Sequence, residues 1–127
     1  MGSEAEAEAA LKACDAVVEA EYRTPILHHC CLETHSAVAD YRGGADATVY
    51  VSTQGTGSIP GESSRELGVP VTGVVQNMGG GFGSKFGIGI AGQWACRLSK
   101  RLWVPVKLLL TRREEFLTSG NGPGSWQ

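Results

Sequence analysis

The sequence lacks several features that define common classes of protein. Its 127 residues contain no apolar run of membrane-spanning length, and the longest candidate, VPVKLLL, is short and carries a lysine. The net charge is only −2, which argues against non-specific binding to nucleic acid or to a membrane surface. The first residues are acidic, so we expect neither a secretory signal nor an Arg-rich transit peptide. We therefore expect a soluble, cytoplasmic chain with a single domain over residues 1–127.

A cysteine framework is also missing. The four cysteines, Cys14, Cys30, Cys31 and Cys96, include no CxxC pair. This spacing predicts reduced thiols, with neither a disulfide framework nor an iron–sulfur cluster. The stretch HHCCLETH, residues 28–35, is rich in metal-ligating types, but alternate residues of an extended segment point to opposite faces and so spread apart. We expect buried small thiols beside partly exposed histidines there, and zinc is the less favoured alternative.

Periodic patterns cover most of the chain. Helices are expected over residues 4–13, 58–68, 86–102 and 112–120, and strands over residues 15–25, 35–44, 47–54, 69–78 and 103–111. The order from Ala47 onward is therefore β-α-β-α-β, and spacers of this length favour right-handed crossovers between parallel strands. The sequence predicts an α/β (α+β) fold, in which an N-terminal helix and strands precede a β-α-β-α-β unit with a parallel core sheet.

Two of these segments carry more specific expectations. The strand over residues 69–78 has the continuous apolar character of a buried strand. On the helix over residues 86–102, one face is predicted to be buried, and it carries Ala91, Ala95, Leu98 and Leu102.

Glycine, by contrast, is concentrated at one place. The stretch QNMGGGFGSKF holds four glycines and a lysine, namely Gly79, Gly80, Gly81, Gly83 and Lys85. Between a strand and a helix, such a run lets the backbone take positive φ values and approach a ligand without a Cβ in the way. Its amides can form a concavity for an anion, although a crowded turn under a tightly packed helix is the alternative. Because parallel strands end at the same sheet edge, we expect Gln54 to lie at this site too.

Two phosphate-binding motifs can be tested against this region. A P-loop needs adjacent Gly-Lys followed by Ser or Thr, but the order here is Gly83-Ser84-Lys85-Phe86. The stretch GIGIAG, residues 87–92, matches GxGxxG but does not directly follow a strand. Its small residues are better explained by close helix packing, so an unrelated nucleotide-binding domain is the least favoured hypothesis.

Four blocks in order carry a more specific signal: YRTPILHHCCLETH, VYVSTQG, LGVPVTGVVQNMGGGFGSKF and VPVKLLLTRREEFLTSG. Together, from Tyr22 to Pro123, they resemble the molybdenum-binding large subunit of the xanthine dehydrogenase and aldehyde oxidase family, nearest to its aldehyde and isoquinoline oxidoreductase branch. The resemblance implies a first molybdopterin-binding subdomain. It also implies molybdopterin as the cofactor of the complete enzyme, which would hydroxylate aldehydes or aromatic heterocycles with water as the oxygen source.

The resemblance also implies roles for individual residues. Gln54 matches the glutamine whose side chain approaches an oxo group on molybdenum. Gly80, Gly81, Phe82 and Gly83 match the segment against the cofactor, with the Phe82 amide near the metal and its ring near the substrate pocket. A neutral amide donor suits a metal-oxo ligand. The structural alternatives are that Gln54 caps a turn and that Phe82 is an ordinary core aromatic.

Two departures from the family pattern bear on substrate and site. Phe86 stands where purine-oxidising members have a glutamate, which favours an aldehyde or another apolar aromatic substrate over a purine. Residues 32–34 read Leu-Glu-Thr where the family often has Met-Glu-Pro. The role of Glu33 therefore stays open, and a solvated carboxylate at the end of a strand is the simplest interpretation.

The resemblance implies that much of a complete enzyme lies outside this sequence. In the family, the general-base glutamate lies far downstream, and the iron–sulfur clusters and flavin reside on other domains or subunits. We therefore assign no catalytic or metal-ligating residue here and expect no turnover by this chain alone. Its expected partners are the remainder of the large subunit and the iron–sulfur and flavin subunits, with neither nucleic acid nor membrane. The alternative is a stand-alone binding or assembly protein that keeps the pterin-binding loop and associates with itself.

Overall fold

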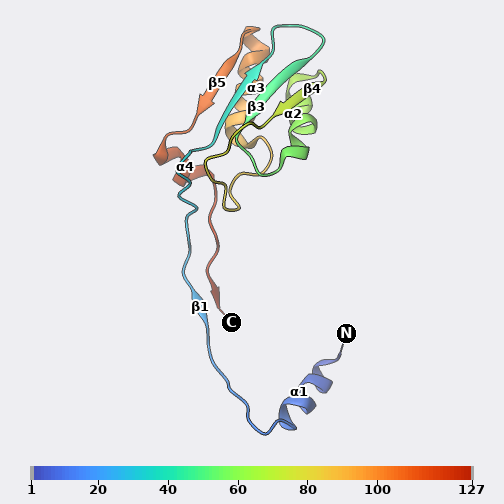
Figure 1. Cartoon of the computed structure of the whole chain (residues 1–127), viewed down its shortest axis with the longest axis vertical. Coiled ribbons are helices and arrows are strands. Elements are labelled where there is room, and N and C mark those ends of the chain that lie inside the picture. The colour runs from blue at the N-terminus through green and yellow to red at the C-terminus, as the bar shows by residue number, and fades with distance from the viewer. Residues whose placement is uncertain (1, 127) are drawn as a thin grey trace. The chain divides into compact units, whose positions relative to one another are not determined.

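The computed structural model describes residues 2–126, which divide into two units, one of residues 2–25 and 123–126 and one of residues 26–122 (Figure 1). The first unit contains helix α1 (Glu4–Lys12) and two short strands, β1 (Arg23–Thr24) and β6 (Ser125–Trp126), which pair antiparallel. None of the helices within residues 2–126 combines the length and the apolar character that crossing a membrane requires.

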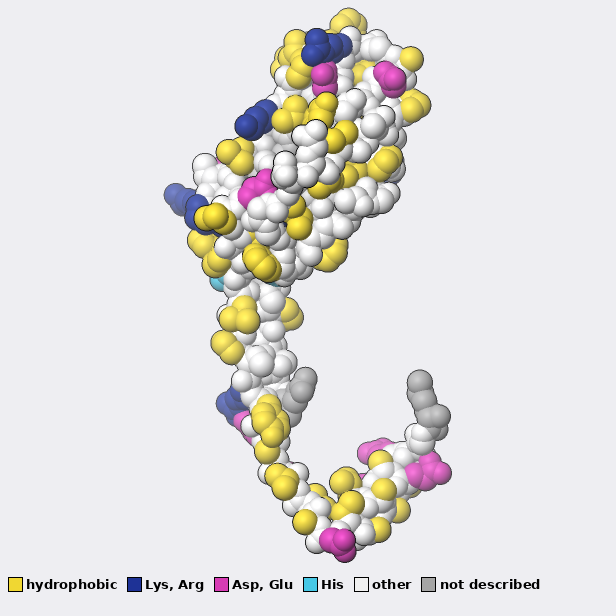
Figure 2. Space-filling view, viewed as in Figure 1, with side chains coloured by type: hydrophobic (Ala, Val, Ile, Leu, Met, Phe, Trp, Pro, Cys, Tyr) yellow, Lys and Arg dark blue, Asp and Glu magenta, His cyan; other side chains and the backbone are white. Residues whose placement is uncertain are grey.

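Helix α1 confirms the expected N-terminal helix, and its start is fixed by local hydrogen bonds. The Ser3 hydroxyl accepts from the Glu6 amide, and the Glu6 carboxylate accepts from the Ser3 amide, which forms a capping box. The same contacts lower the pKa of Glu6, with the backbone bond the largest cause. The helix buries none of its residues, and Figure 2 shows acidic side chains around it.

The prediction of a strand over residues 15–25 is wrong except near its end, where β1 covers Arg23–Thr24. Val17 and Val18 are 58% and 90% exposed, so their side chains have no apolar surface to cover. A strand is stable only when a neighbour pairs with it or a core covers one face. Within the described residues, neither is present before Arg23.

The second unit is a four-stranded sheet with three helices. The strands are β2 (Ser36–Asp40), β3 (Ala47–Val51), β4 (Val71–Val74) and β5 (Val106–Leu109), and the helices are α2 (Ile59–Leu67), α3 (Gly89–Leu102) and α4 (Arg112–Thr118), with a 3₁₀ turn η1 (Thr56–Ser58). The sheet order is β4-β3-β2-β5. β3 and β4 are parallel, whereas β2 is antiparallel to both β3 and β5. The predicted α/β (α+β) class is confirmed, with a mixed sheet.

The mixed sheet preserves one consequence of the predicted topology. Because β2 reverses direction between β3 and β5, strands β3, β4 and β5 all run the same way. Their carboxyl ends therefore lie at one edge of the sheet. The β-α-β-α-β order from Ala47 is as expected, but its last strand is separated from the first two by an earlier segment of the chain.

The core lies between one face of the sheet and helices α2 and α3. The strands contribute alternate residues to it, namely Ala37, Ala39, Ala47, Val49 and Val51. The two helices contribute Ile59, Leu67, Ala95 and Cys96. The opposite face of the sheet is open, since Tyr50 and Leu109 are 44% and 55% exposed. The strand over residues 69–78 is shorter and less buried than predicted, because β4 is at the edge of the sheet.

Helix α3 begins at Gly89, three residues later than the start predicted at residue 86, and it buries a different face from the one expected. Ala91 and Ala95 are buried as predicted, but Leu98 and Leu102 are 40% and 58% exposed. Small residues take their place in the interface: Gly92, Cys96 and Ser99. Small side chains let the helix axis approach the sheet closely, which explains why hydrophobicity alone pointed to the wrong side.

Candidate functional site

The glycine loop and Gln54 meet at the carboxyl edge shared by β3 and β4, as the sequence predicted. The backbone amide of Gln54 donates to the Lys85 carbonyl at 2.8 Å, and the Thr53 hydroxyl donates to the same oxygen at 3.1 Å. The segment that follows β3 is thereby tied to the end of the loop that follows β4. This edge is where open α/β sheets usually bind their ligands.

The side chain of Gln54 has a defined orientation. Its Oε1 atom accepts a hydrogen bond from the Gly83 amide at 2.9 Å. Because a backbone N–H can only donate, this contact assigns the oxygen to the loop side and leaves the –NH₂ group as a donor for another partner. A Cβ on Gly81 would lie 2.5 Å from Gln54 Cδ, so only glycine permits this approach. Gln54 does bind a turn, as the structural alternative held, but through its oxygen only.

A tight turn forms the tip of the loop. The Gly81 carbonyl accepts from the Ser84 amide and from the Ser84 hydroxyl, each at 2.8 Å. Its two central residues, Phe82 and Gly83, have φ values of +49° and +92°, as a type I′ turn requires. For phenylalanine this left-handed conformation costs about 1 kcal/mol. Strain of this kind occurs often at functional sites.

Phe82 is not a core residue, because its side chain is 72% exposed. The ring lies beside Gly80, where an added Cβ would be 2.8 Å from Phe82 Cε2. Gly80 itself has a φ of +94°. The glycine therefore leaves room for the ring and takes a conformation that other residues rarely adopt.

Several hydrogen-bond donors of this tip have no acceptor in the described part of the chain. Within residues 2–126, no group accepts a hydrogen bond from the backbone amides of Gly80, Gly81 or Phe82. Together with the –NH₂ group of Gln54, they form a set of neutral donors without any acidic side chain among them. Such a set favours an anion or a metal-oxo group over a cation.

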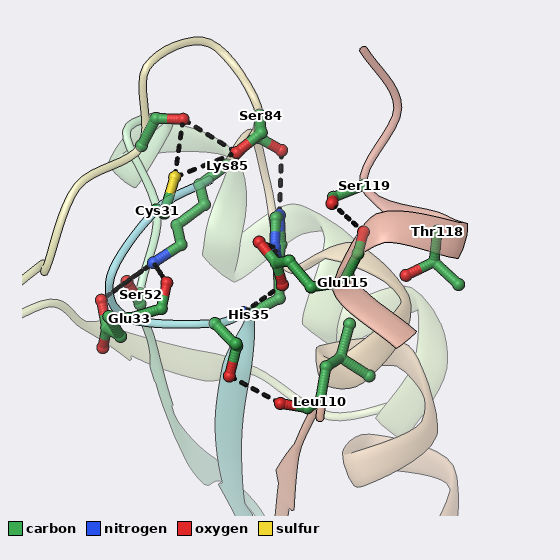
Figure 3. Close-up of polar contacts among 12 residues, drawn as sticks. Cys31, Glu33, His35, Ser52, Ser84, Lys85, Leu110, Glu115, Thr118 and Ser119 are labelled. Atoms are coloured by element: carbon green, nitrogen blue, oxygen red, sulfur yellow. Dashed lines mark hydrogen bonds and ion pairs between the residues drawn. The ribbon is translucent and has the colours of Figure 1, made fainter. Parts of the chain in front are cut away.

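An ion pair between the buried Lys85 and the partly exposed Glu33 holds the base of the loop (Figure 3). Lys85 is fully buried, and its Nζ donates to the Glu33 carboxylate at 2.9 Å, the Glu33 carbonyl at 2.8 Å and the Ser52 hydroxyl at 3.1 Å. Glu33 in turn accepts from the Ser52 hydroxyl and from the Gly79 amide, each at 2.6 Å. The three donors of the ammonium group are all used, which a buried charge requires.

Glu33 is therefore more than a solvated carboxylate at the end of a strand. Burial raises the pKa of its carboxyl group, but the hydrogen bonds from Ser52, Lys85 and Gly79 outweigh that effect and hold the pKa below the ordinary value. The pairing of Glu33 with Lys85 could not be predicted from the sequence, because no local pattern links residues 52 positions apart. The one available signal was a lysine placed directly after the glycine loop.

The stretch HHCCLETH contributes alternate side chains to the loop. Cys31 lies with its Sγ 3.4 Å from the Gly81 carbonyl, and His35 Nε2 lies 2.9 Å from the Ser84 carbonyl, on either side of Glu33. The intervening Leu32 is 93% exposed. Across the part of the chain that the structure describes, no group of three or more His, Cys, Asp or Glu side chains is arranged to hold a metal ion.

All four cysteines are free thiols, as predicted. Cys31 and Cys96 are buried, whereas Cys14 and Cys30 are exposed. Burial raises the pKa of the Cys96 thiol to about 11, and the nearby charge of Glu66 adds to this effect. The expected buried thiols are thus confirmed for one member of the adjacent pair only.

Comparisons with known proteins identify relatives for almost the whole chain. The model of the molybdopterin cofactor-binding domain family matches residues 2–127. The nicotinate dehydrogenase large molybdopterin subunit of Eubacterium barkeri is 35% identical over 116 residues, which are 88% of this chain and 27% of the relative. The putative xanthine dehydrogenase molybdenum-binding subunit of Escherichia coli K12 is 30% identical over 112 residues, which are 86% of this chain and 15% of the relative.

Solved structures share the fold. Quinoline 2-oxidoreductase from Pseudomonas putida 86 superposes with a TM-score of 0.74 at 24% identity, over 88% of this chain and 15% of that one. CO dehydrogenase from Oligotropha carboxidovorans superposes with a TM-score of 0.72 at 25% identity, over 90% and 15% of the two chains. The chain thus spans between 15% and 27% of the length of these relatives.

Proposed function

Because the chain belongs to the family of molybdopterin cofactor-binding domains, as its sequence blocks predicted, we propose that the glycine loop and Gln54 form one wall of the cofactor site of an oxidoreductase similar to xanthine dehydrogenase. The observation that supports these residue roles is a set of donors without an acceptor among the described residues, close together in the chain's fold at the carboxyl edge, where Gln54 contacts the loop. The groups that would hold the cofactor are the backbone amides of Gly80, Gly81 and Phe82 and the –NH₂ group of Gln54.

The donor set fits the chemistry of that group. Backbone amides fixed in a turn stabilise developing negative charge without moving, and a neutral glutamine amide adds a donor without adding charge. When bound, the molybdenum cofactor supplies the redox centre at which a substrate carbon is hydroxylated and electrons are accepted. The role of Gln54 is to donate from Nε2 while Gly83 holds its oxygen, and the role of Phe82 is to present an exposed apolar ring beside the site.

The activity of the complete protein is part of the proposal, since the chain spans about a quarter or less of its relatives. We infer hydroxylation of an aldehyde or an aromatic heterocycle. Two relatives are named for heteroaromatic compounds, nicotinate and quinoline, and Phe86 presents a 66% exposed ring where a purine-binding glutamate would otherwise stand. The remainder of a large subunit and the iron–sulfur and flavin subunits are the proposed partners, and this chain alone would be inactive.

A binding experiment tests the proposed cofactor wall. Purified molybdenum cofactor is titrated into the ¹⁵N-labelled chain while amide resonances are followed by NMR. We expect saturable shifts at Gly80, Gly81 and Phe82. The Gly81→Ala variant, whose Cβ would displace Gln54, should bind about tenfold or more weakly.

The matched control is Gly61→Ala, because a Cβ on Gly61 meets nothing within 4 Å. That variant should bind as the wild type does. Saturable binding that leaves the loop amides unshifted, or that is unchanged in Gly81→Ala, would contradict the assignment of this wall.

A further inference from the structure

Another pair of side chains, His35 and Glu115, contacts the glycine loop at Ser84, and the proposed cofactor contacts do not use it. His35 precedes β2, and Glu115 lies on α4, 80 positions further along the chain. Their side chains are only 12% and 2% exposed. Figure 3 shows the two side chains between α4 and Ser84.

The hydrogen bonds of His35 assign its protons. Nε2 lies 2.9 Å from the Ser84 carbonyl, and because a carbonyl only accepts, Nε2 carries a proton and donates it. Nδ1 faces the Glu115 carboxyl group, with distances of 2.9 Å to Oε1 and 3.0 Å to Oε2. One further proton therefore lies between Nδ1 and the carboxyl group.

Glu115 also fixes the backbone from which the ring projects. Its Oε2 accepts from the His35 amide at 2.8 Å, so one carboxyl group binds both the main chain and the ring of the same residue. The ring is held at Nδ1 by Glu115 and at Nε2 by the Ser84 carbonyl, so it cannot rotate about its χ angles without losing both contacts. Nε2 is thus aimed at a single acceptor, the Ser84 carbonyl.

Ser84 is the residue that closes the turn at the tip of the loop. Its amide and hydroxyl bind the Gly81 carbonyl, and between these two residues lie Phe82 and Gly83 in their left-handed conformations. The peptide of Ser84 sets the end of this strained turn. Holding its carbonyl therefore limits how far the turn can relax.

We propose that His35 is a positioning residue. Its ring is held by a hydrogen bond between Nδ1 and Glu115, and it donates from Nε2 to the Ser84 carbonyl. This contact fixes the end of the turn and so maintains the orientation of the amides of the glycine loop that bind the ligand. The pair links α4 to the loop. The inference rests on the proposed function only for what the loop binds, since the holding of the loop is a property of this chain alone.

Hydrogen exchange in the full chain without ligand tests this role. The amides of Gly83 and Ser84 are bonded within the site and report its opening. In His35→Phe the hydrogen bond to the Ser84 carbonyl is lost, and in Glu115→Ala the ring that donates it is no longer held, so exchange at both amides should become about tenfold faster or more. His28→Phe is the matched control, since His28 is exposed and contacts Phe116 of α4 rather than the loop.

The conservative variant separates positioning from general stability. In Glu115→Gln, the amide –NH₂ can donate to Nδ1 of a neutral ring while Nε2 keeps its proton, so the Ser84 contact survives. We expect Glu115→Gln to retain slow exchange at Gly83 and Ser84, unlike Glu115→Ala. Equal exchange in these two variants, or wild-type exchange in His35→Phe, would overturn the proposal.

A measurement on the wild type keeps the proposal falsifiable even where a variant does not fold. The ¹⁵N resonances of the His35 ring should show a protonated Nε2, and an unprotonated Nε2 would overturn the proposal. Neither this measurement nor the exchange rates involve the cofactor. A failure of cofactor binding with the expected exchange pattern would therefore count only against the proposed function.

Discussion

At the residue scale, one buried ammonium group determines how firmly the loop is attached. Lys85 has no exposed surface, and Glu33 is its only anionic partner among the described residues. Removing the charge of Glu33 leaves a desolvated cation, which is more costly than the pair itself is stabilising. We expect Glu33→Gln to lower the free energy of unfolding in urea by about 3 kcal/mol. The pair Glu66–Arg97 provides the control, because its cation is half exposed and stays hydrated when Glu66 is changed, so Glu66→Gln should cost less than about 1 kcal/mol.

The same pair makes a prediction about pH. Because the folded pKa of Glu33 lies below its ordinary value of 4.5, its contribution to stability is fully present above that value and is lost as the pH falls through the lower, folded pKa. The stability difference between the wild type and Glu33→Gln should therefore be constant near neutral pH and shrink below about pH 4.5. A difference that stayed constant down to pH 2 would show that the Glu33 charge does not hold Lys85.

At the scale of elements, the features that could be predicted are those with local signals. α2 begins with Pro60 in its first turn and ends at Gly68 in the left-handed conformation, and α4 starts with a capping box between Thr111 and Glu114. The pairing of β5 with β2 could not be predicted in this way. It joins Ala37 to residues some 70 positions away, and neither strand carries a mark of its partner.

In the candidate site, too, only the residues with a local sequence signal could be predicted. The loop and Gln54 could be found, because the glycines are contiguous and parallel strands share a carboxyl edge. The residues that hold the loop could not, since Glu33 and His35 reach partners 52 and 80 positions away. Their side-chain types are common on protein surfaces, and only the fold shows that they are largely withdrawn from solvent.

The contact between α2 and β4 gives a prediction at this scale. An added Cβ on Gly73 of β4 would lie 2.7 Å from Ile59 Cγ2, at the start of α2. Gly73→Ala should therefore push the helix from the sheet and cost about 1–3 kcal/mol of unfolding free energy. Gly61 lies in α2 with open space around it, so Gly61→Ala should instead stabilise the chain by about 0.5–1 kcal/mol. Equal effects of the two substitutions would show that the helix does not pack as described.

At the scale of the whole molecule, the two units differ in what they bury. The core residues all belong to the unit of residues 26–122, where Figure 2 also shows many hydrophobic side chains on the visible surface. In the other unit, α1 buries no residue, and the residues between it and β1 are exposed. Burial of apolar surface is the main source of folding free energy, so the two units should contribute very unequally to stability.

Deletion of residues 1–22 tests this inequality. The deletion leaves β1, β6 and every core residue in place, so the free energy of unfolding in urea should change by less than about 0.5 kcal/mol. Limited digestion with trypsin should likewise cleave first at Lys12, on the exposed helix, and spare Lys85 until the sheet unfolds. A large loss of stability on deletion would mean that α1 covers apolar surface, and that the fold of residues 26–122 depends on it.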